Sequence, residues 1–434
     1  MRLVAAALAA CLSVPACAAE SAVETVGLHG QATYVWQAKP GLHAAYSGPN
    51  SLRTEHERSY SFTATAAAGV RPWRDAEAYL DAEAVQGVPL SGLVGLGGLT
   101  NSELQKTGGP RIKVYRARAF LRQSWALSDE RENIESDFNQ LGGTQAHRRV
   151  VLTVGNLAVS DLFDDNRYAH DGRTLFLNWA LLTHGHYDFA ADSRGYSRGA
   201  ALEWIDEGWA VRAGRFEVPK ESNGLALDSR AGSRHGDQIE LEHAHQLAAR
   251  EGTLRLLWFR NVAPMGNFDE ALADAAVTGA APELPRVRRL QAKQGFGVAL
   301  EQTLGDTLGG FVRLGRHDGK TEVYSFAAID NALSAGLVWK GAAWQRADDQ
   351  LGLAFASDGL SAAHQRFLAA GGSDFFVGDG RLRYGRETVL EAFYNLALVR
   401  GWTLALDLQH IGNPAYNRDR GPAHTVALRL HAEL

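Results

Sequence analysis

The chain ends on His424-Thr-Val-Ala-Leu-Arg-Leu-His-Ala-Glu-Leu434, and this stretch decides the fold class. Apolar residues occupy alternate positions up to Leu434, and Arg429, His431 and Glu433 stand between them. Because side chains on a β-strand point to opposite faces with period two, the tail has one apolar face and one polar face. Such an end is typical of an outer-membrane barrel, whose last strand closes the ring between lipid and a wet lumen.

The N-terminus predicts export. Met1-Arg2 is a short positive start, Leu3–Val14 is apolar, and Pro15-Ala-Cys-Ala-Ala19 is a small-residue cleavage zone. The apolar run is too short to span a bilayer. We therefore expect residues 1–19 to be a signal peptide and residues 20–434 to form a single barrel domain.

Composition excludes several classes of function. The only cysteines, Cys11 and Cys17, fall in the expected signal peptide, so the mature chain has no disulfide framework or thiol chemistry. A lipoprotein attachment at Cys17 is disfavoured, because Val-Pro-Ala before it matches such sites poorly. The remainder has no apolar run long enough for an inner-membrane helix and no Lys/Arg cluster of the kind that binds nucleic acid. Loss of Arg2 changes the formal charge from −5 to −6, so the mature chain is nearly neutral for its size.

Short segments of alternating apolar and polar residues recur along the mature chain. The clearest hairpins are Ser59–Val70 with Ala76–Ala84, Gly199–Trp204 with Trp209–Phe216, Phe296–Thr303 with Leu308–Gly315, and Ser334–Lys340 with Ala342–Arg346. Very short turns alternate with long polar connections, which are Pro40–Arg58, Ser128–His147, Ser160–Arg173, Val218–Gly236, Ala263–Gln294 and Asp358–Arg381. In an outer-membrane barrel, long loops connect the strands at the outer end and short turns connect them at the periplasmic end. We expect an all-β, transmembrane antiparallel β-barrel of about 16 strands, rather than a soluble β-sandwich or propeller.

A row of arginines is the sharpest polar pattern. Within Tyr115–Trp125, Arg116, Arg118 and Arg122 share one parity. Each guanidinium facing lipid at the bilayer midplane would cost about 2–4 kcal/mol, so we expect all three to face the lumen.

The preceding segment supplies carboxylates that we also expect to point inward: Glu77, Asp81 and Glu83. Two interpretations are open. Acids and arginines could pair into a wall network that stiffens the barrel. Alternatively, the arginines could line the pore, where guanidinium forks donate hydrogen bonds to vicinal sugar hydroxyls and charge tunes which solutes enter.

The segment Asp161-Leu-Phe-Asp-Asp-Asn-Arg-Tyr-Ala-His-Asp171 carries too many charges for a lipid-facing strand. We expect it to fold into the lumen as a constricting loop. Its polar candidates are Asp164, Asp165, Asn166, Arg167, His170 and Asp171. Calcium binding is disfavoured, because the acidic run lacks the EF-hand spacing and its closing glutamate.

Other site chemistries have weaker support. His184-Gly-His186 and His243-Ala-His245 each place two imidazoles on one strand face, a geometry that binds zinc, but no clear third ligand is nearby. A lipid hydrolase built into the barrel is the enzyme alternative, and we find no Gly-x-Ser-x-Gly elbow. We therefore expect no metal, no cofactor and no catalytic residue.

Several long motifs resemble the carbohydrate-selective outer-membrane porins of the OprB family. They are Tyr115–Trp125, Leu162–Asp171, Phe176–Ala180, Leu351–Phe355, His364–Gly372, the turn Gly378–Gly380 before Tyr384, Glu387 and Glu391, and the end block Asn413–Pro422. The similarity runs through nearly the whole mature chain, and its motifs are long and ordered. The chain departs from the family at Leu434, where such barrels usually end on an aromatic residue, so recognition by the barrel-insertion machinery should weaken but survive.

The resemblance implies a 16-stranded barrel in the outer membrane of a Gram-negative bacterium. It implies passive conduction of glucose-like monosaccharides without a cofactor, and it favours a lumenal role for Arg116, Arg118 and Arg122. The expected partners are sugar solutes, outer-membrane lipids and the insertion machinery; nucleic acid is not expected, and a homo-oligomer stays open. The alternatives are a general or anion-preferring porin without a sugar site, and an outer-membrane barrel hydrolase.

Overall fold

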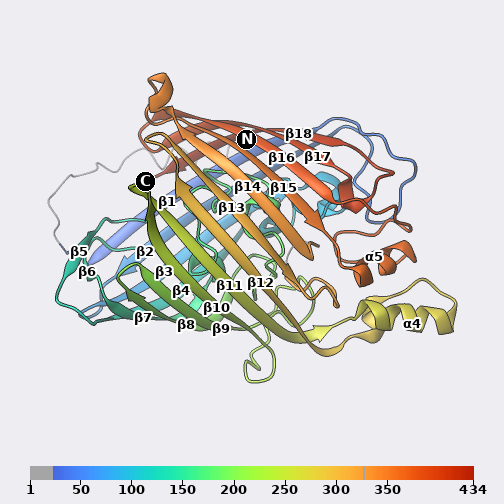
Figure 1. Ribbon diagram of the computed structural model, residues 1–434, viewed down its shortest axis with the longest axis horizontal. Coiled ribbons are helices and arrows are strands. Elements are labelled where there is room, and N and C mark those ends of the chain that lie inside the picture. The colour runs from blue at the N-terminus through green and yellow to red at the C-terminus, as the bar shows by residue number, and fades with distance from the viewer. Residues whose placement is uncertain (1–22, 326–327) are drawn as a thin grey trace.

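The structure, a computed structural model, describes residues 23–325 and 328–434. The expected signal peptide, residues 1–19, lies outside these ranges. Within them, sixteen strands pair in sequence order and β1 pairs with β18, so the sheet closes into an antiparallel barrel (Figure 1). No helix of the described ranges is long and apolar enough to cross a bilayer.

The strands of the ring are mostly 10 residues or longer. They are β1 (Val26–Lys39), β2 (Glu57–Val70), β3 (Ala76–Val88), β4 (Lys113–Ala126), β7 (Arg149–Leu157), β8 (Ser197–Asp206), β9 (Trp209–Phe216), β10 (His235–Leu247), β11 (Arg250–Met265), β12 (Arg289–Thr303), β13 (Leu308–His317), β14 (Asn331–Lys340), β15 (Gln350–Gly359), β16 (Glu387–Val399), β17 (Trp402–Gly412) and β18 (Ala423–Glu433). A separate two-stranded sheet consists of β5 (Arg131–Ile134) and β6 (Gly143–Ala146). The α-helices are α2 (Leu104–Thr107), α3 (Trp179–Leu182), α4 (Phe268–Thr278) and α5 (Ala362–Ala369). Single 3₁₀ turns lie at Leu90–Leu93, Val159–Asp161, Leu284–Val287, Gly341–Trp344 and Pro414–Tyr416.

Apolar and polar side chains alternate along the strands, with the apolar ones outside, as a membrane barrel requires. On β12, Phe296 and Val298 are exposed on the outer face, whereas Lys293 and Glu301 are buried inside. Apolar side chains outside and polar side chains inside are the reverse of a soluble barrel, because the outer surface meets lipid.

The terminal segment forms the closing strand that its alternation predicts. On β18, Leu428 is exposed outside, whereas Arg429 is buried inside the barrel. Backbone hydrogen bonds between Gly30 and Leu434 run in both directions, at 3.1 and 2.8 Å, and join the chain end to β1. Closure pairs the backbone amides that would otherwise have no partner in hydrocarbon.

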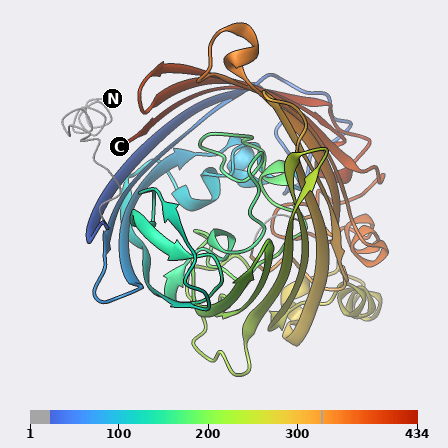
Figure 2. The same cartoon turned by 60° about the vertical axis from the view of Figure 1, so that its left-hand side comes forward.

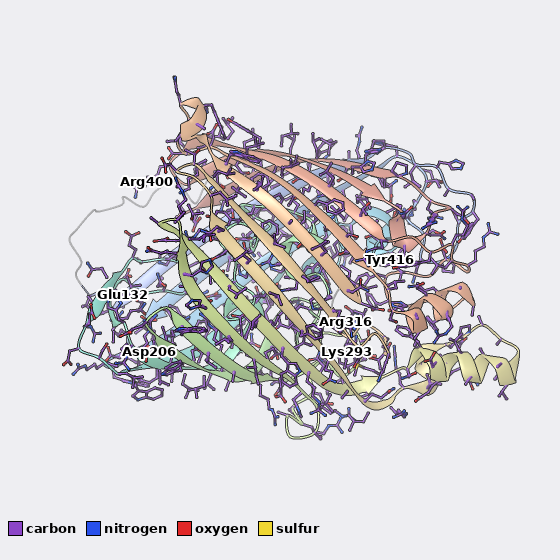
Figure 3. The ribbon with its side chains drawn as sticks, in the orientation of Figure 1. Glu132, Asp206, Lys293, Arg316, Arg400 and Tyr416 are labelled. Atoms are coloured by element: carbon purple, nitrogen blue, oxygen red, sulfur yellow. The ribbon has the colours of Figure 1, made fainter. Side chains whose placement is uncertain are left out.

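The two ends of the barrel carry different connections. Short turns such as Gly208 and Arg400-Gly401 lie at the end where β1 begins and β18 ends, and long loops with α4 and α5 lie at the other end (Figure 1). Asp206 and Arg400 mark the short-turn end and Tyr416 the long-loop end (Figure 3). In an outer-membrane barrel the short-turn end is periplasmic.

Two expected connections are wrong. Ser128–His147, expected as an outer loop, joins β4 to β7 at the periplasmic end and folds into the β5–β6 hairpin. The expected strand Ala342–Arg346 is instead a 3₁₀ turn, Gly341–Trp344, followed by Gln345 with φ 66°. Arg346 pairs with Asp349 across this turn at 2.5 Å, which favours the compact turn over an extended strand.

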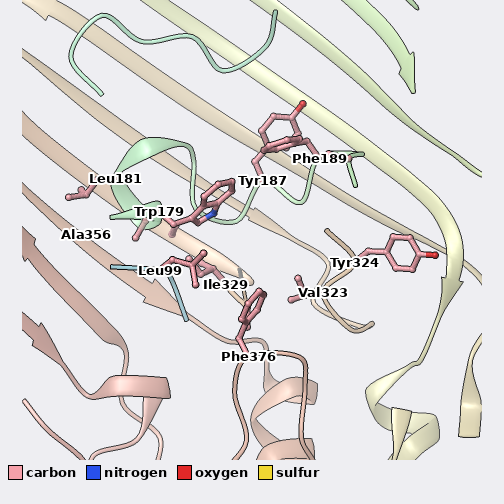
Figure 4. Close-up of a cluster of buried hydrophobic side chains, with 14 of the residues drawn as sticks. Leu99, Trp179, Leu181, Tyr187, Phe189, Val323, Tyr324, Ile329, Ala356 and Phe376 are labelled. Atoms are coloured by element: carbon pink, nitrogen blue, oxygen red, sulfur yellow. The ribbon is translucent and has the colours of Figure 1, made fainter. Parts of the chain in front are cut away.

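The lumen is partly filled by chain that folds inward from the long-loop end. Residues 89–112, between β3 and β4, and residues 158–196, between β7 and β8, lie inside the ring (Figure 2). Their apolar side chains pack with inward residues of other loops and strands. Members of this core include Leu99, Trp179, Leu181, Tyr187, Phe189, Val323, Tyr324, Ile329, Ala356 and Phe376 (Figure 4).

Candidate functional site

A cavity of about 600 Å³ lies inside the barrel. Its wall comes from β4 and β7, from the inward segments 89–112 and 158–196, and from the turn between β5 and β6. Phe138 and Asn139 line it from the periplasmic hairpin, and Arg194 and Tyr196 line it just before β8 begins at the extracellular end. The cavity therefore touches elements from both ends of the barrel.

The cavity wall balances positive and negative charge. Its cations are Lys106, Arg118, Arg122, Arg173 and Arg194, and its carboxylates are Glu103, Asp137, Asp161, Asp165 and Asp171. Five cations face five carboxylates, so the wall presents many charged groups but little net charge. Such a wall is rich in fixed hydrogen-bond donors and acceptors.

Arg118 is held at the cavity wall by two carboxylates. Its Nε and Nη2 donate to Asp161 at 2.7 and 2.6 Å, and its Nη1 donates to Asp81 at 3.2 Å. Its Cζ lies 5.4 Å from the ring centroid of Tyr196. The bidentate pair fixes the orientation of the guanidinium, while 15% of the side chain stays exposed.

Arg122 links the barrel wall to the periplasmic hairpin. Its Nη1 donates to Glu77 at 3.3 Å and to the backbone carbonyl of Asn139 at 3.0 Å. Glu77 also accepts from Arg71 at 3.2 Å and from the Tyr79 hydroxyl at 2.8 Å. A quarter of the Arg122 side chain remains exposed.

Glu83 is buried behind the cavity wall and serves the wall network. It accepts hydrogen bonds from the hydroxyls of Tyr115 and Tyr196 and from Arg173 Nη2, the last at 3.0 Å. No part of its side chain is exposed. We infer that Glu83 holds the inward loops in place and does not meet a solute.

Glu103 continues this network on the inward segment 89–112. Lys106 Nζ and Arg173 Nη2 each lie 3.4 Å from its carboxylate. Burial raises the pKa of Glu103, but the charges of Arg173 and Lys106 outweigh burial and hold the pKa below its ordinary value. The carboxylate therefore stays ionised at neutral pH.

Arg116 does not face the lumen, so the expectation that all three arginines share one face is wrong. The register between β3 and β4 shifts by one residue, because Asp81 lies opposite Arg118 but Ala82 lies opposite Arg116. The extra residue, Ala117, is buried, and Arg116 is exposed on the outer side with Ala82. A β-bulge reverses side-chain parity at this point. Near the membrane interface an outward arginine costs only about 0–1 kcal/mol, which removes the objection to this placement.

The expected constriction loop does enter the lumen, and its candidate residues fall into three groups. Asp165, His170 and Asp171 line the cavity. Arg167 does not line it; its guanidinium is largely exposed and lies 3.5 Å from Glu251.

Asp164 and Asn166 are buried and shape the loop from within. Asp164 accepts from the backbone N–H of His184 at 2.8 Å and lies 3.1 Å from Arg313 Nε. Asn166 accepts from the backbone N–H groups of Tyr168 and Ala169 at 2.9 and 3.1 Å. These two residues position the loop and do not present a group to a solute.

The opposite wall anchors the same loop through Arg429 and Glu391, to which the sequence pattern assigns no role at the site. Arg429 Nη1 donates to the carbonyls of Gly172 and Leu175 at 2.7 and 2.6 Å. Glu391 accepts from the backbone N–H groups of Leu177 and Asn178 at 2.5 and 3.0 Å. Inward parity on the late strands was the available signal, but the partners lie more than 200 positions away in the sequence.

The histidine pairs have other partners. His184-x-His186 lies in the loop after α3 and not on a strand, and His184 Nδ1 is 2.7 Å from Asp164 Oδ1. His243 stacks on Trp209 with ring centroids 4.0 Å apart. Within residues 23–325 and 328–434, no group of three or more His, Cys, Asp or Glu is arranged to hold a metal ion.

A closed sixteen-stranded barrel with an apolar outer face, inward loops and a charged internal cavity defines an outer-membrane channel. Residues 50–434 match the family of carbohydrate-selective porins, OprB family. The match covers most of the chain, which therefore belongs to the OprB family. It is a multi-pass β-barrel of the Gram-negative outer membrane and a carbohydrate-selective porin.

Solved porin structures share this fold. The high-pH structure of Pseudomonas putida OprB superposes with a TM-score of 0.70 at 17% identity, covering 94% of this chain and 94% of that chain. The low-pH structure of the same protein gives a TM-score of 0.50 at 12% identity, covering 94% and 93%. No curated protein sequence matches the chain. The predicted fold class and family are confirmed, and membership in a porin family leaves the hydrolase alternative without support.

Proposed function

We propose that glucose-like monosaccharides cross the barrel through the 600 Å³ cavity and bind there transiently against Arg118 and Arg122. The charge balance of the wall carries this proposal. An anion-preferring pore would need an excess of cations, whereas five cations against five carboxylates suit a neutral solute with many hydroxyl groups.

The side chains of the cavity match the chemistry of a sugar. Each hydroxyl both donates and accepts, so it can bond a guanidinium and a carboxylate together, as at Arg118 and Asp161. Phe138 and Tyr196 add apolar surface for the C–H faces of the ring. Because conduction requires release, the site must bind weakly.

The rival function is a general porin with the same barrel and no sugar site. Planar-bilayer recordings separate the two. Added glucose should reduce the ion current in a saturable manner, and the double variant Arg118→Gln/Arg122→Gln should need at least about ten-fold more glucose for half-block, from the loss of charged hydrogen bonds. Arg316→Gln, on the outer face of β13, is the matched control.

The alternative outcome is equally definite. A current that does not respond to glucose at any concentration would support the general porin and refute a sugar site. Liposome swelling over a panel of sugars then identifies the preferred solute.

Other partners follow from the outer face and the chain end. The apolar outer face of the strands suits outer-membrane lipid, and the alternation at Val426, Leu428 and Leu430 supports recognition by the insertion machinery despite the terminal Leu434. Adding a terminal Phe after Leu434 should increase the folded yield in the membrane if that recognition is weakened. Mass measurement of the detergent-solubilised channel decides whether it is a monomer or a homo-oligomer.

A further inference from the structure

Arg116, turned outward by the bulge in β4, lies at a groove on the outer face of the barrel. The groove has a volume of about 420 Å³ and crosses the extracellular halves of β4, β7, β8 and β9. Its guanidiniums come from Arg116, Arg198 and Arg215. Its small residues are Ala119, Gly155, Gly199 and Ala231. Gly155 and Gly199 hold inward positions of their strands, in register with the buried Phe120 and Phe216, so they add only backbone to the groove. Ala119, opposite the exposed Leu80, is the short outward side chain beside Arg116.

The groove carries uncompensated positive charge. Arg198 Nε donates to Glu217 at 2.8 Å, and Arg215 donates through two nitrogens to Asp237 at 2.7 and 2.9 Å. Arg116 makes no ion pair with any residue that the structure describes. Arg198 and Arg215 are therefore each neutralised by a carboxylate, and the uncompensated charge at the groove is that of Arg116.

The outward residues of β8 and β9 place the groove at one membrane interface. From the periplasmic turn upward, β9 presents Trp209, Val211, Ala213 and Arg215 on its outer face, and β8 shows the same order from Trp204 to Arg198. Tryptophan marks one interface and the apolar residues mark the hydrocarbon layer. The arginines therefore lie at the extracellular interface, where the headgroups of the outer leaflet begin.

We infer that this groove binds a phosphate-bearing glycolipid of the outer leaflet, of the lipid A class. Guanidinium forks recognise phosphate oxygens in a bidentate manner, and Arg116 has its charge free for that role. The short side chain of Ala119 beside Arg116 gives an acyl chain or sugar of the same molecule a place against the barrel. The inference does not depend on the sugar pathway, because the groove and the cavity lie on opposite faces of the wall.

The test uses the full mature chain in detergent and bisphosphorylated lipid A as the probe. Arg116→Gln should weaken binding by about five-fold, the typical contribution of one basic residue near an anionic surface. Removing both phosphates from the lipid should weaken binding more. Arg58→Gln is the matched control, because Arg58 is also exposed on the outer face, on β2 and away from the groove.

Several results would overturn the inference. An equal loss with Arg58→Gln would indicate a general charge effect, and equal binding of dephosphorylated lipid A would exclude phosphate recognition. Inorganic phosphate that binds as tightly as the lipid would exclude a lipid site.

A dimer that dissociates in Arg116→Gln would assign the groove to a second copy of the chain. Glucose block in Arg116→Gln should match the unaltered channel, which checks that the barrel is folded.

Discussion

The two halves of the barrel lumen use arginine in different ways. Beside β3, β4 and β7 the lumen keeps a cavity, and 15% of the Arg118 side chain and 25% of the Arg122 side chain are exposed. Against β13 and β18 the lumen is filled by residues 158–196, and only 1% of Arg313 and 1% of Arg429 is exposed. All four side chains point inward. An inward charge therefore does not by itself mark the path of a solute; the groups that face it decide its role.

The largest expected effect is on the filled side. Arg313→Ala removes the cation beside Asp164 and the donor to the Leu181 carbonyl, at 3.1 and 3.0 Å. Breaking a buried ion pair by removing one partner costs about 3–5 kcal/mol, so the unfolding free energy in denaturant should fall by that amount. Arg316→Ala, outward on the same strand, should cause no such loss (Figure 3). Equal stability of Arg313→Ala and the unaltered chain would contradict an anchoring role.

On the open side the main effect should fall on sugar affinity. Arg118→Ala removes a fixed fork and leaves Asp161 and Asp81 without their cation. We expect glucose half-block to require about ten-fold more sugar, because a charged hydrogen bond contributes about 1.5–3 kcal/mol. The reversal potential should also shift toward cation selectivity. Arg118→Lys keeps the charge but loses the paired hydrogen bonds of the guanidinium, so its glucose concentration for half-block should lie between those of the unaltered channel and Arg118→Ala. A value equal to that of Arg118→Ala would mean that the guanidinium geometry, rather than the charge, binds the sugar.

A smaller effect is expected at Arg122, because this side chain also secures the hairpin through the carbonyl of Asn139. Arg122→Ala should weaken glucose block about five-fold and raise the open-channel current, since a hydrogen bond from a guanidinium already shared with Glu77 and Asn139 contributes about 1 kcal/mol. Bilayer recordings give both quantities from the same channels. A weaker block without any rise in current would mean that Arg122 does not hold the hairpin.

The dependence of the unfolding free energy on acid pH tests the ion pairs of Glu103 with Lys106 and Arg173. Because the pKa of Glu103 is lowered in the folded chain, the unfolded chain binds the proton first as the pH falls below about 4.3. The stabilisation is complete above that pH and is lost as the pH falls through the lower native pKa. Between about pH 5 and pH 2, the unfolding free energy of Glu103→Gln should therefore fall by about 1 kcal/mol less, or by a still smaller amount, than that of the unaltered chain. Parallel curves for both chains would contradict the ion pairs with Lys106 and Arg173.

The smallest effect should come from Arg116, which lies on the same strand as Arg118 but outside. Arg116→Ala should leave glucose block and conductance unchanged, because the side chain faces away from the cavity. Titration of glucose against the current provides the measurement. A change as large as that of Arg118→Ala would mean that the bulge at Ala117 is absent.

Much of the fold follows from local pattern, and the exceptions have physical causes. Alternation in β18 and the contrast between turns and loops predict a closed barrel, because both record which face meets lipid. The length of Ser128–His147 predicts an outer loop, but that length comes from the β5–β6 hairpin, so loop length alone does not show at which end this connection lies.

The site is harder to predict than the fold. No feature of the sequence marks Ala117 as the extra residue of a bulge, yet that residue reverses the direction of Arg116. The charges of loop 161–171 predict that it lies in the lumen. Which of its residues face the cavity depends on partners such as Arg313, 149 positions from Asp164. Contacts of that separation leave no local pattern.

The central claim is that sugar passes along the cavity between β4 and the inward loop, and labelling of an introduced cysteine tests it most directly. No cysteine follows Cys17, so a single thiol can be placed at Ser160, which lines the cavity. A charged thiol reagent should reduce the current of Ser160→Cys channels, and glucose should slow the reaction. Ala119→Cys, on the outer face of β4, should not respond. Modification of Ser160→Cys at the same rate with and without glucose, or a current loss in Ala119→Cys, would contradict this pathway.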